Sequence, residues 1–89
     1  MPERAAHSEL VRAATPLTVG SVSLLPIERI VLHADRREAH AWYAAVKEPY
    51  ALIVRDADGV RAFDRNAETI PLEALREELP GLDALLAAM

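Results

Sequence analysis

The 89 residues of this chain are enough for one domain but too few to close two hydrophobic cores, so we expect a single domain over residues 1–89. The composition, 52% hydrophobic and 27% charged, is that of a globular protein and excludes disorder over most of the length. The absence of cysteine excludes disulfides, thiol catalysis and thiolate metal sites, and it favours a reducing compartment. A formal net charge of -4 argues against bulk electrostatic attraction to nucleic acid or anionic lipid.

The start of the chain has no apolar run of the signal-peptide kind. The longest uncharged stretch, Ala13 to Ile27, is too short and too polar to span a bilayer. We therefore expect a cytoplasmic protein that has no membrane partner.

Residues 2–14 predict an N-terminal helix, because Ala6, Leu10 and Ala13 form a weak apolar stripe. Thr15-Pro16 should end it, since the residue before proline avoids the helical region. From Leu17 onwards, strands are expected instead.

The next segments predict two strands. Leu17 to Leu25 alternates with a change of phase near Gly20-Ser21, which is typical of a bulge or bend. Pro26 should interrupt this strand, and Ile27 to His33 should form the second one. Asp35-Arg36-Arg37 then has the composition of a turn.

Residues 38–46 suit a helix or a strand, but nine residues between two turn signals, with aromatic residues at the centre, favour a strand. Lys47-Glu48-Pro49 predicts the next turn. Tyr50 to Arg55 is the clearest strand of the chain, and Asp56 to Gly59 predicts a hairpin turn. Val60 to Phe63 returns as its partner and is expected at a sheet edge.

Two short helices are expected after the strands. Pro71 should set the first turn of a helix that ends near Leu79, and Pro80-Gly81 should stop it. A second helix follows, with an apolar stripe that favours docking on the domain itself over exposure: Leu82, Leu85, Leu86 and Met89. The expected fold class is mainly β (α+β), a small, strongly bent antiparallel sheet or barrel of 4–5 strands with one N-terminal and two C-terminal helices.

No motif indicates an enzyme, a metal centre or a cofactor site. His33 and His40 flank the Asp35–Arg37 turn, and a two-residue turn at Arg36-Arg37 would set them opposite each other, but a zinc site needs a third ligand that the sequence does not identify. The serines lie outside any nucleophile elbow. Asp56 and Asp58 fit the hydrogen bonding of a turn.

The aromatic residues suggest a binding role. Trp42 and Tyr43 are adjacent, so in a strand they point to opposite faces, and they cannot both be core residues of a one-sided sheet. One of them should face solvent, a helix or another subunit. The candidates for RNA or partner binding are Trp42 and Tyr50 as stacking surfaces and Arg61 as a donor.

The stretch Ile30 to Asp58 resembles the first motif of the Sm and Sm-like family of small bent barrels. Asp35-Arg-Arg-Glu38 falls on the first turn of that motif, Ala41 on its bend glycine, and Leu52-Ile-Val54 with Asp56 on its last strand. The resemblance implies an Sm-like barrel that forms homo-oligomeric rings and binds RNA. Lys47 and Ala51 stand at the aspartate and RNA-contacting asparagine of the family, and the second motif is matched at best by Val60-Arg61-Ala62.

The alternative hypothesis is a protein–protein adaptor of bacterial pleckstrin-like type, a bent sheet closed by C-terminal helices. Its partner would add to a sheet edge or cover the leucine-rich tail. For the Sm-like hypothesis we expect a homo-oligomer formed by edge-strand pairing. An acidic surface around the binding pocket would favour the adaptor, and a basic aromatic groove would favour RNA.

Overall fold

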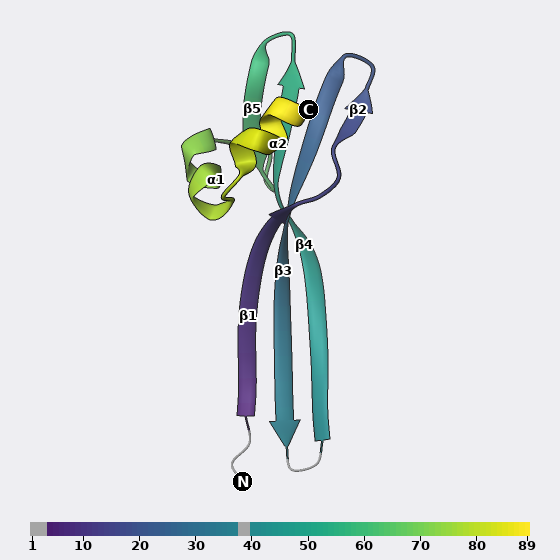
Figure 1. The fold of residues 1–89 in the computed structure, drawn as a ribbon, viewed down its shortest axis with the longest axis vertical. Helices are drawn as coiled ribbons and strands as arrows, with labels where there is room; N and C mark the ends of the chain where they lie inside the picture. Colours follow the sequence, from purple (N-terminus) through teal and green to yellow (C-terminus); the bar gives the residue numbers. More distant parts are fainter. Residues whose placement is uncertain (1–3, 38–39) are drawn as a thin grey trace.

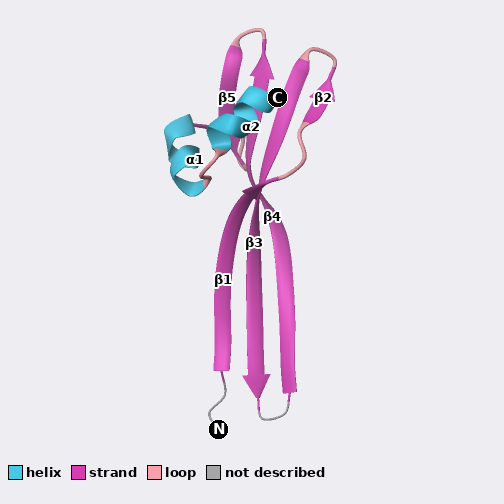
Figure 2. Ribbon diagram, in the orientation of Figure 1, coloured by secondary structure: helices cyan, strands magenta, loops and turns pink. Residues whose placement is uncertain are grey.

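The computed structural model of the chain describes residues 4–37 and 40–89, which form a six-stranded antiparallel sheet and two short helices (Figures 1 and 2). The strand order is β1-β3-β4-β5-β6, and β2 pairs with β3 on the same side as β1. The strands are β1 Arg4–Ala13, β2 Leu17–Val19, β3 Val22–Arg37, β4 His40–Asp56, β5 Gly59–Asp64 and β6 Thr69–Ile70. The helices are α1 Leu72–Glu78 and α2 Leu82–Ala88.

The molecule has two parts, which we call the head and the arm. The arm consists of β1 with residues 28–37 of β3 and 40–49 of β4, and the head is the rest (Figure 1). The molecule measures 59 × 25 × 24 Å, with a radius of gyration of 17.0 Å. A compact domain of this length would have a radius of about 12 Å. The arm therefore extends from the head as a bare sheet.

A β-bulge separates the arm from the head. Ile27 pairs with Ala51 and Glu28 pairs with Pro49, which leaves Tyr50 as an extra residue on β4. A bulge bends the strand and increases its right-handed twist. The strands accordingly cross at this waist in Figure 1, and the arm and the head present differently oriented surfaces.

The hydrophobic core lies in the head, between one face of the sheet and the two helices. Residues two apart on each strand supply the sheet side of this core, as strand alternation requires. The buried residues of the core are Leu25, Ile27, Ala51, Ile53 and Ala62 from the strands and Leu75, Leu79, Leu82 and Leu86 from the helical segment. We call this side of the sheet the covered face and the opposite side the open face.

The prediction of an N-terminal helix is wrong, because residues 4–13 form strand β1. Each residue from Arg4 to Ala13 pairs with one from Arg36 to Ile27. The weak stripe of Ala6, Leu10 and Ala13 offers a helix few contacts, whereas β3 offers a complete ladder of hydrogen bonds. Non-local pairing has overridden local propensity here.

Three other boundaries differ from the sequence prediction. Gly20-Ser21 is a hairpin turn, in which Gly20 has a φ of 61°, and not a bulge within one strand. Pro26 does not interrupt β3. On one side of β3 the paired strand changes from β2 to β1 at this position, so the hydrogen-bond ladder has a gap there and the missing N–H of proline is tolerated. The turn expected at Lys47-Glu48-Pro49 does not form, and β4 continues through it along the exposed edge of the arm.

Most of the remaining elements agree with the prediction. The turn expected at Asp35–Arg37 is wrong, and Val60–Phe63, expected at a sheet edge, is one only in part, because Ala62 and Phe63 pair with β6. The strands around Ile27–His33, Tyr50–Arg55 and Val60–Phe63, the Asp56–Gly59 hairpin and both C-terminal helices are present. Residues 40–46 are a strand, while residues 38 and 39 lie outside the described part, and β3 runs through the expected turn to Arg37. The sheet is open, so the barrel, one of the two forms expected, is not formed.

Candidate interaction surfaces

The structure does not bring together the three residues singled out from the sequence. Trp42 lies in the arm, where its backbone pairs with Asp35, and its side chain is outside the described part. Tyr50 is at the waist, eight residues and roughly 26 Å further along the strand at about 3.3 Å per residue. Arg61 lies beyond it in the head, paired in register with Val54. These residues do not form one binding site.

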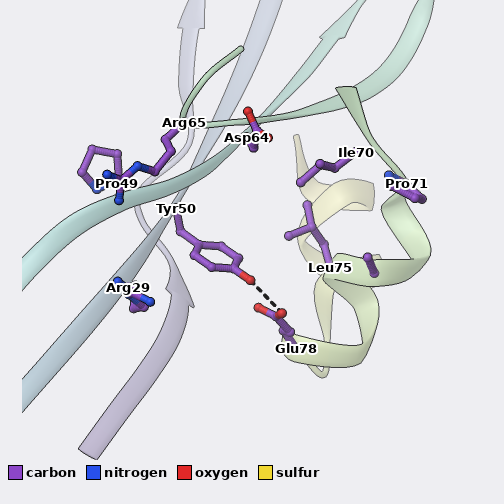
Figure 3. Close-up of a pocket in the computed structure, with 10 residues that line it drawn as sticks. Arg29, Pro49, Tyr50, Asp64, Arg65, Ile70, Pro71, Leu75 and Glu78 are labelled. Carbon is purple, nitrogen blue, oxygen red and sulfur yellow. Dashed lines mark hydrogen bonds between the residues drawn. The ribbon is translucent and has the colours of Figure 1, made fainter. Parts of the chain in front are cut away.

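Tyr50 joins the bulge to α1. Its hydroxyl donates a hydrogen bond to Glu78 Oε1 at 2.7 Å, and its ring packs against the edge of the head core (Figure 3). The hydrogen bond to Glu78 raises the pKa of the Tyr50 phenol above its usual 10.0, with smaller contributions from burial and from the Glu78 charge. A protonated Tyr50 therefore holds the helix against the waist.

A hollow of about 390 Å³ lies beside Tyr50 at the waist (Figure 3). Its wall combines apolar residues of α1 with charged residues of the strands and the loop after β5: Arg29, Pro49, Tyr50, Asp64, Arg65, Ile70, Pro71, Ala74, Leu75 and Glu78. Sequence reasoning found only Tyr50 in this set. Pro49 and Tyr50, at the bulge, line the hollow, and the sequence prediction of a turn at Lys47-Glu48-Pro49 did not allow for a bulged strand there.

The charges around this hollow are balanced. Arg29 donates to Glu48 Oε1 at 2.8 Å, and Arg65 Nη1 lies 3.6 Å from the other oxygen of the same carboxylate. The hydrogen bond to Glu48 raises the pKa of Arg29 above its usual value. Arg29 and Arg65 thus share the carboxylate of Glu48, and the carboxylate of Glu78 accepts the hydrogen bond of Tyr50. The hollow is therefore neither a basic groove nor an acidic surface.

Arg61 is also engaged within the β4–β5 hairpin. Its guanidinium donates to Asp56 Oδ2 and lies over the ring of Phe63, 5.8 Å from the centroid. The other oxygen of Asp56 accepts a hydrogen bond from the backbone N–H of Asp58 at 2.8 Å, which confirms the turn chemistry expected for Asp56. The guanidinium is half-exposed, but its charge is already compensated.

The histidines do not meet in the way that the sequence suggested. Arg37 is the residue that pairs with His40, and His33 pairs with Ala44, so the two-residue turn at Arg36-Arg37 is not formed. Among the residues whose side chains the structure describes, 8–34 and 44–89, no group of three histidine, aspartate or glutamate side chains is placed to hold a metal ion.

Sequence reasoning missed the most extensive feature, the open face of the sheet. Large apolar side chains lie along it in the arm and in the head. They are Leu10, Leu17, Leu24, Pro26, Ile30, Leu32, Leu52, Val54 and Phe63, each placed by its register with neighbours on the same face. Leu10 is 56% exposed, Leu17 53% and Leu32 39%, and the others are half-buried.

One sequence signal pointed to this face. Ile30-Val31-Leu32 is an unbroken apolar run, and in a strand such a run places apolar side chains on both sides of the sheet. Val31 is buried on the covered-face side, only 8% exposed, while Ile30 and Leu32 point the other way. A strand of this kind requires cover on both faces, and the chain supplies none over the open face among its described residues.

Comparisons with protein-family models, with curated proteins and with solved structures find no match. Neither helix in the described part of the chain has the length and apolar character needed to cross a membrane.

Proposed function

We propose that this chain is a non-catalytic protein-binding module that works by assembling with copies of itself. The observation that carries the proposal is the arm, a long strand assembly with large apolar side chains in contact with water. Leu10 is 56% exposed and Leu32 39% on the same face of the arm. Single exposed apolar residues are ordinary, but a row of them along a projecting sheet is typical of an interaction surface.

The stability of the arm supports the same function. A three-stranded sheet needs a hydrophobic face packed on something to be stable in water. The helices α1 and α2 lie over the head, and of the described arm residues of β1 it is Val11 and Ala13, next to the waist, that pack against the core (Figure 2). The arm strands, ten residues long in β1, have unpaired backbone groups at both outer edges as well. Packing against another chain would bury this surface and stabilise the arm.

The arrangement of the charges favours a protein partner over RNA. Binding to a phosphate backbone depends on arginine and lysine side chains that can exchange their counterions for phosphates. Among residues 8–34 and 44–89, whose side chains are described, three arginines form ion pairs with carboxylates along the sheet: Arg12 with Glu28, Arg29 with Glu48, and Arg61 with Asp56. The adaptor hypothesis from the sequence therefore has more support than an RNA-binding ring of the Sm type.

Light scattering of the purified protein tests this proposal, with and without a short oligouridine at low salt. We expect an oligomer whose mass is the same in the presence of RNA. A monomer at all accessible concentrations would overturn self-assembly. A ring-sized oligomer that binds the oligouridine would overturn the protein-binding function and support the Sm-like alternative.

A further inference from the structure

We infer that the partner surface is the open face and that its occupant is a second copy of this chain, packed sheet to sheet with the helices on the outside. This inference rests on the proposed self-assembly and specifies how it occurs. It differs from edge-strand pairing, the mode expected from the sequence, because the contact is made by side chains and leaves the strand edges free.

The open face is continuous from the head into the arm. Along β3 its residues are Leu24, Pro26, Glu28, Ile30 and Leu32, and the bulge lies on β4, so the alternation of β3 is not broken. Glu28 is the only charged member of this series, and Arg12 on the neighbouring strand binds it at 2.7 Å. An apolar stripe with one compensated charge therefore runs through the waist.

The size of this face matches what a stable dimer needs. With about 3.3 Å per residue along a strand and about 4.8 Å between strands, the open faces of arm and head together measure roughly 800 Å². A standard specific interface buries roughly 800 Å² on each partner. The arm alone would provide only about half of that area, so the contact should include the head, with the second copy following the twist of the sheet at the waist.

The distribution of charge allows two copies to meet on this face. The acidic residues of the helical segment outnumber its one arginine: Glu73, Glu77, Glu78 and Asp83 against Arg76. Among residues 8–34 and 44–89, whose side chains are described, the open face instead carries the Arg12–Glu28 and Arg61–Asp56 pairs and Lys47. For a chain with net charge -4, contact through the open faces keeps the acidic helices of the two copies apart.

The covered-face side of the arm is a poorer contact surface. Arg29 and Glu48, joined in an ion pair, lie next to Val31 and Val46 on this side. Their side chains are each about a third exposed, 34% and 28%, so a partner would have to desolvate the pair. Val46 thus provides a matched control: it is exposed, apolar and on the arm, but on the other face.

Charge insertion on the two faces tests the inference. In Leu32→Glu and Leu10→Glu, a carboxylate enters the open face at exposed positions, and we expect at least a tenfold weaker self-association by light scattering over a dilution series. Val46→Glu should retain the mass of the unmodified protein. Circular dichroism of each variant checks that the head is folded, and Leu10→Ser provides a milder change if a glutamate prevents folding.

A second measurement does not depend on destabilising variants. Because the chain has no cysteine, Leu32→Cys and Val46→Cys each introduce a single thiol. We expect maleimide to label Cys at position 32 slowly at high protein concentration and faster on dilution, and to label position 46 at one rate throughout. Equal behaviour of the two positions, or dissociation caused by Val46→Glu alone, would overturn the open face as the contact. A monomeric unmodified protein would instead overturn the self-assembly on which the inference rests.

Discussion

Arg55 connects the end of α2 to the centre of the head sheet. Its guanidinium donates to the carbonyl oxygen of Met89 at 2.9 Å and to that of Leu86. The last carbonyls of a helix have no partner within the helix, and a cation near that end also interacts favourably with the helix dipole. This side chain, which comes from a strand, therefore fixes the position of a helix only two turns long.

Replacing Arg55 with methionine should reduce the free energy of unfolding by about 1–2 kcal/mol, since two charge-assisted hydrogen bonds are lost while the aliphatic stem is kept. Urea unfolding followed by circular dichroism measures this change. Arg76→Met is the control, because Arg76 forms ion pairs with Asp83 and Glu73 on the exposed surface and its loss should leave the midpoint unchanged. If both variants lowered the free energy of unfolding equally, the hydrogen bonds of Arg55 to the end of α2 would contribute no specific stability.

The Tyr50–Glu78 hydrogen bond should be visible in an alkaline titration. In a Tyr43→Phe background Tyr50 is the only tyrosine. The midpoint of its absorbance change should lie above pH 10, since the hydrogen bond to Glu78 raises the pKa of its phenol. Because the folded pKa is the higher one, the stabilisation is complete below the unfolded value of about 10 and is lost as the pH rises through the folded value. Glu78→Gln should lower the midpoint towards the ordinary value, and an unchanged midpoint would contradict the assigned cause.

At the scale of elements, the β4–β5 hairpin depends on one glycine. Gly59 has a φ of 113°, a conformation that side chains disfavour, and a Cβ built there would meet no atom within 4 Å. The cost of Gly59→Ala therefore comes from the backbone alone, and we expect a loss of about 1–3 kcal/mol in thermal or urea unfolding. Asp58→Ala, at the preceding exposed position, keeps the backbone N–H that donates to Asp56, so it should leave the free energy of unfolding nearly unchanged. A neutral Gly59→Ala would mean that the turn relaxes to another form.

The elements that could be predicted from the sequence are those with local signals. The Asp-Ala-Asp-Gly turn and the leucine spacing of the helices are encoded within a few residues, and both form as expected. The strand β1 is specified by its partner β3, about twenty residues away, so the residues of β1 alone suggested a helix. Pro49 likewise has the local signal of a turn, but it lies on an edge where no hydrogen-bond donor is needed.

The candidate site was less predictable than the fold. Tyr50 was singled out as a stacking surface, but the structure places it in a hydrogen bond with Glu78, a residue 28 positions away. Arg61 was singled out as a donor, and it already donates to Asp56. The open face is formed by every second residue of several strands. It can be recognised only when the register and the position of the helices are known.

At the scale of the whole molecule, the stability of the arm should depend on protein concentration more strongly than the stability of the head. The head has its own core, whereas the buried apolar residue in the described part of the arm is Val31. Segments with few buried contacts open at low free-energy cost, so their amide hydrogens exchange quickly with solvent. Binding of a second copy stabilises only what it covers or orders, by an amount that grows with the concentration of free partner.

Hydrogen exchange at two protein concentrations therefore gives a direct prediction. Amides of residues 28–34 and 44–48, in the arm, should exchange more slowly as concentration rises through the range of self-association, because the arm is then packed on its partner. The α1 and α2 amides, on the outer side of the head that the partner does not cover, should slow less than those of the arm. In Leu32→Glu the arm should exchange quickly at both concentrations. An arm that is strongly protected even in dilute solution would show that three bare strands are stable alone, and the need for a partner would disappear with that result.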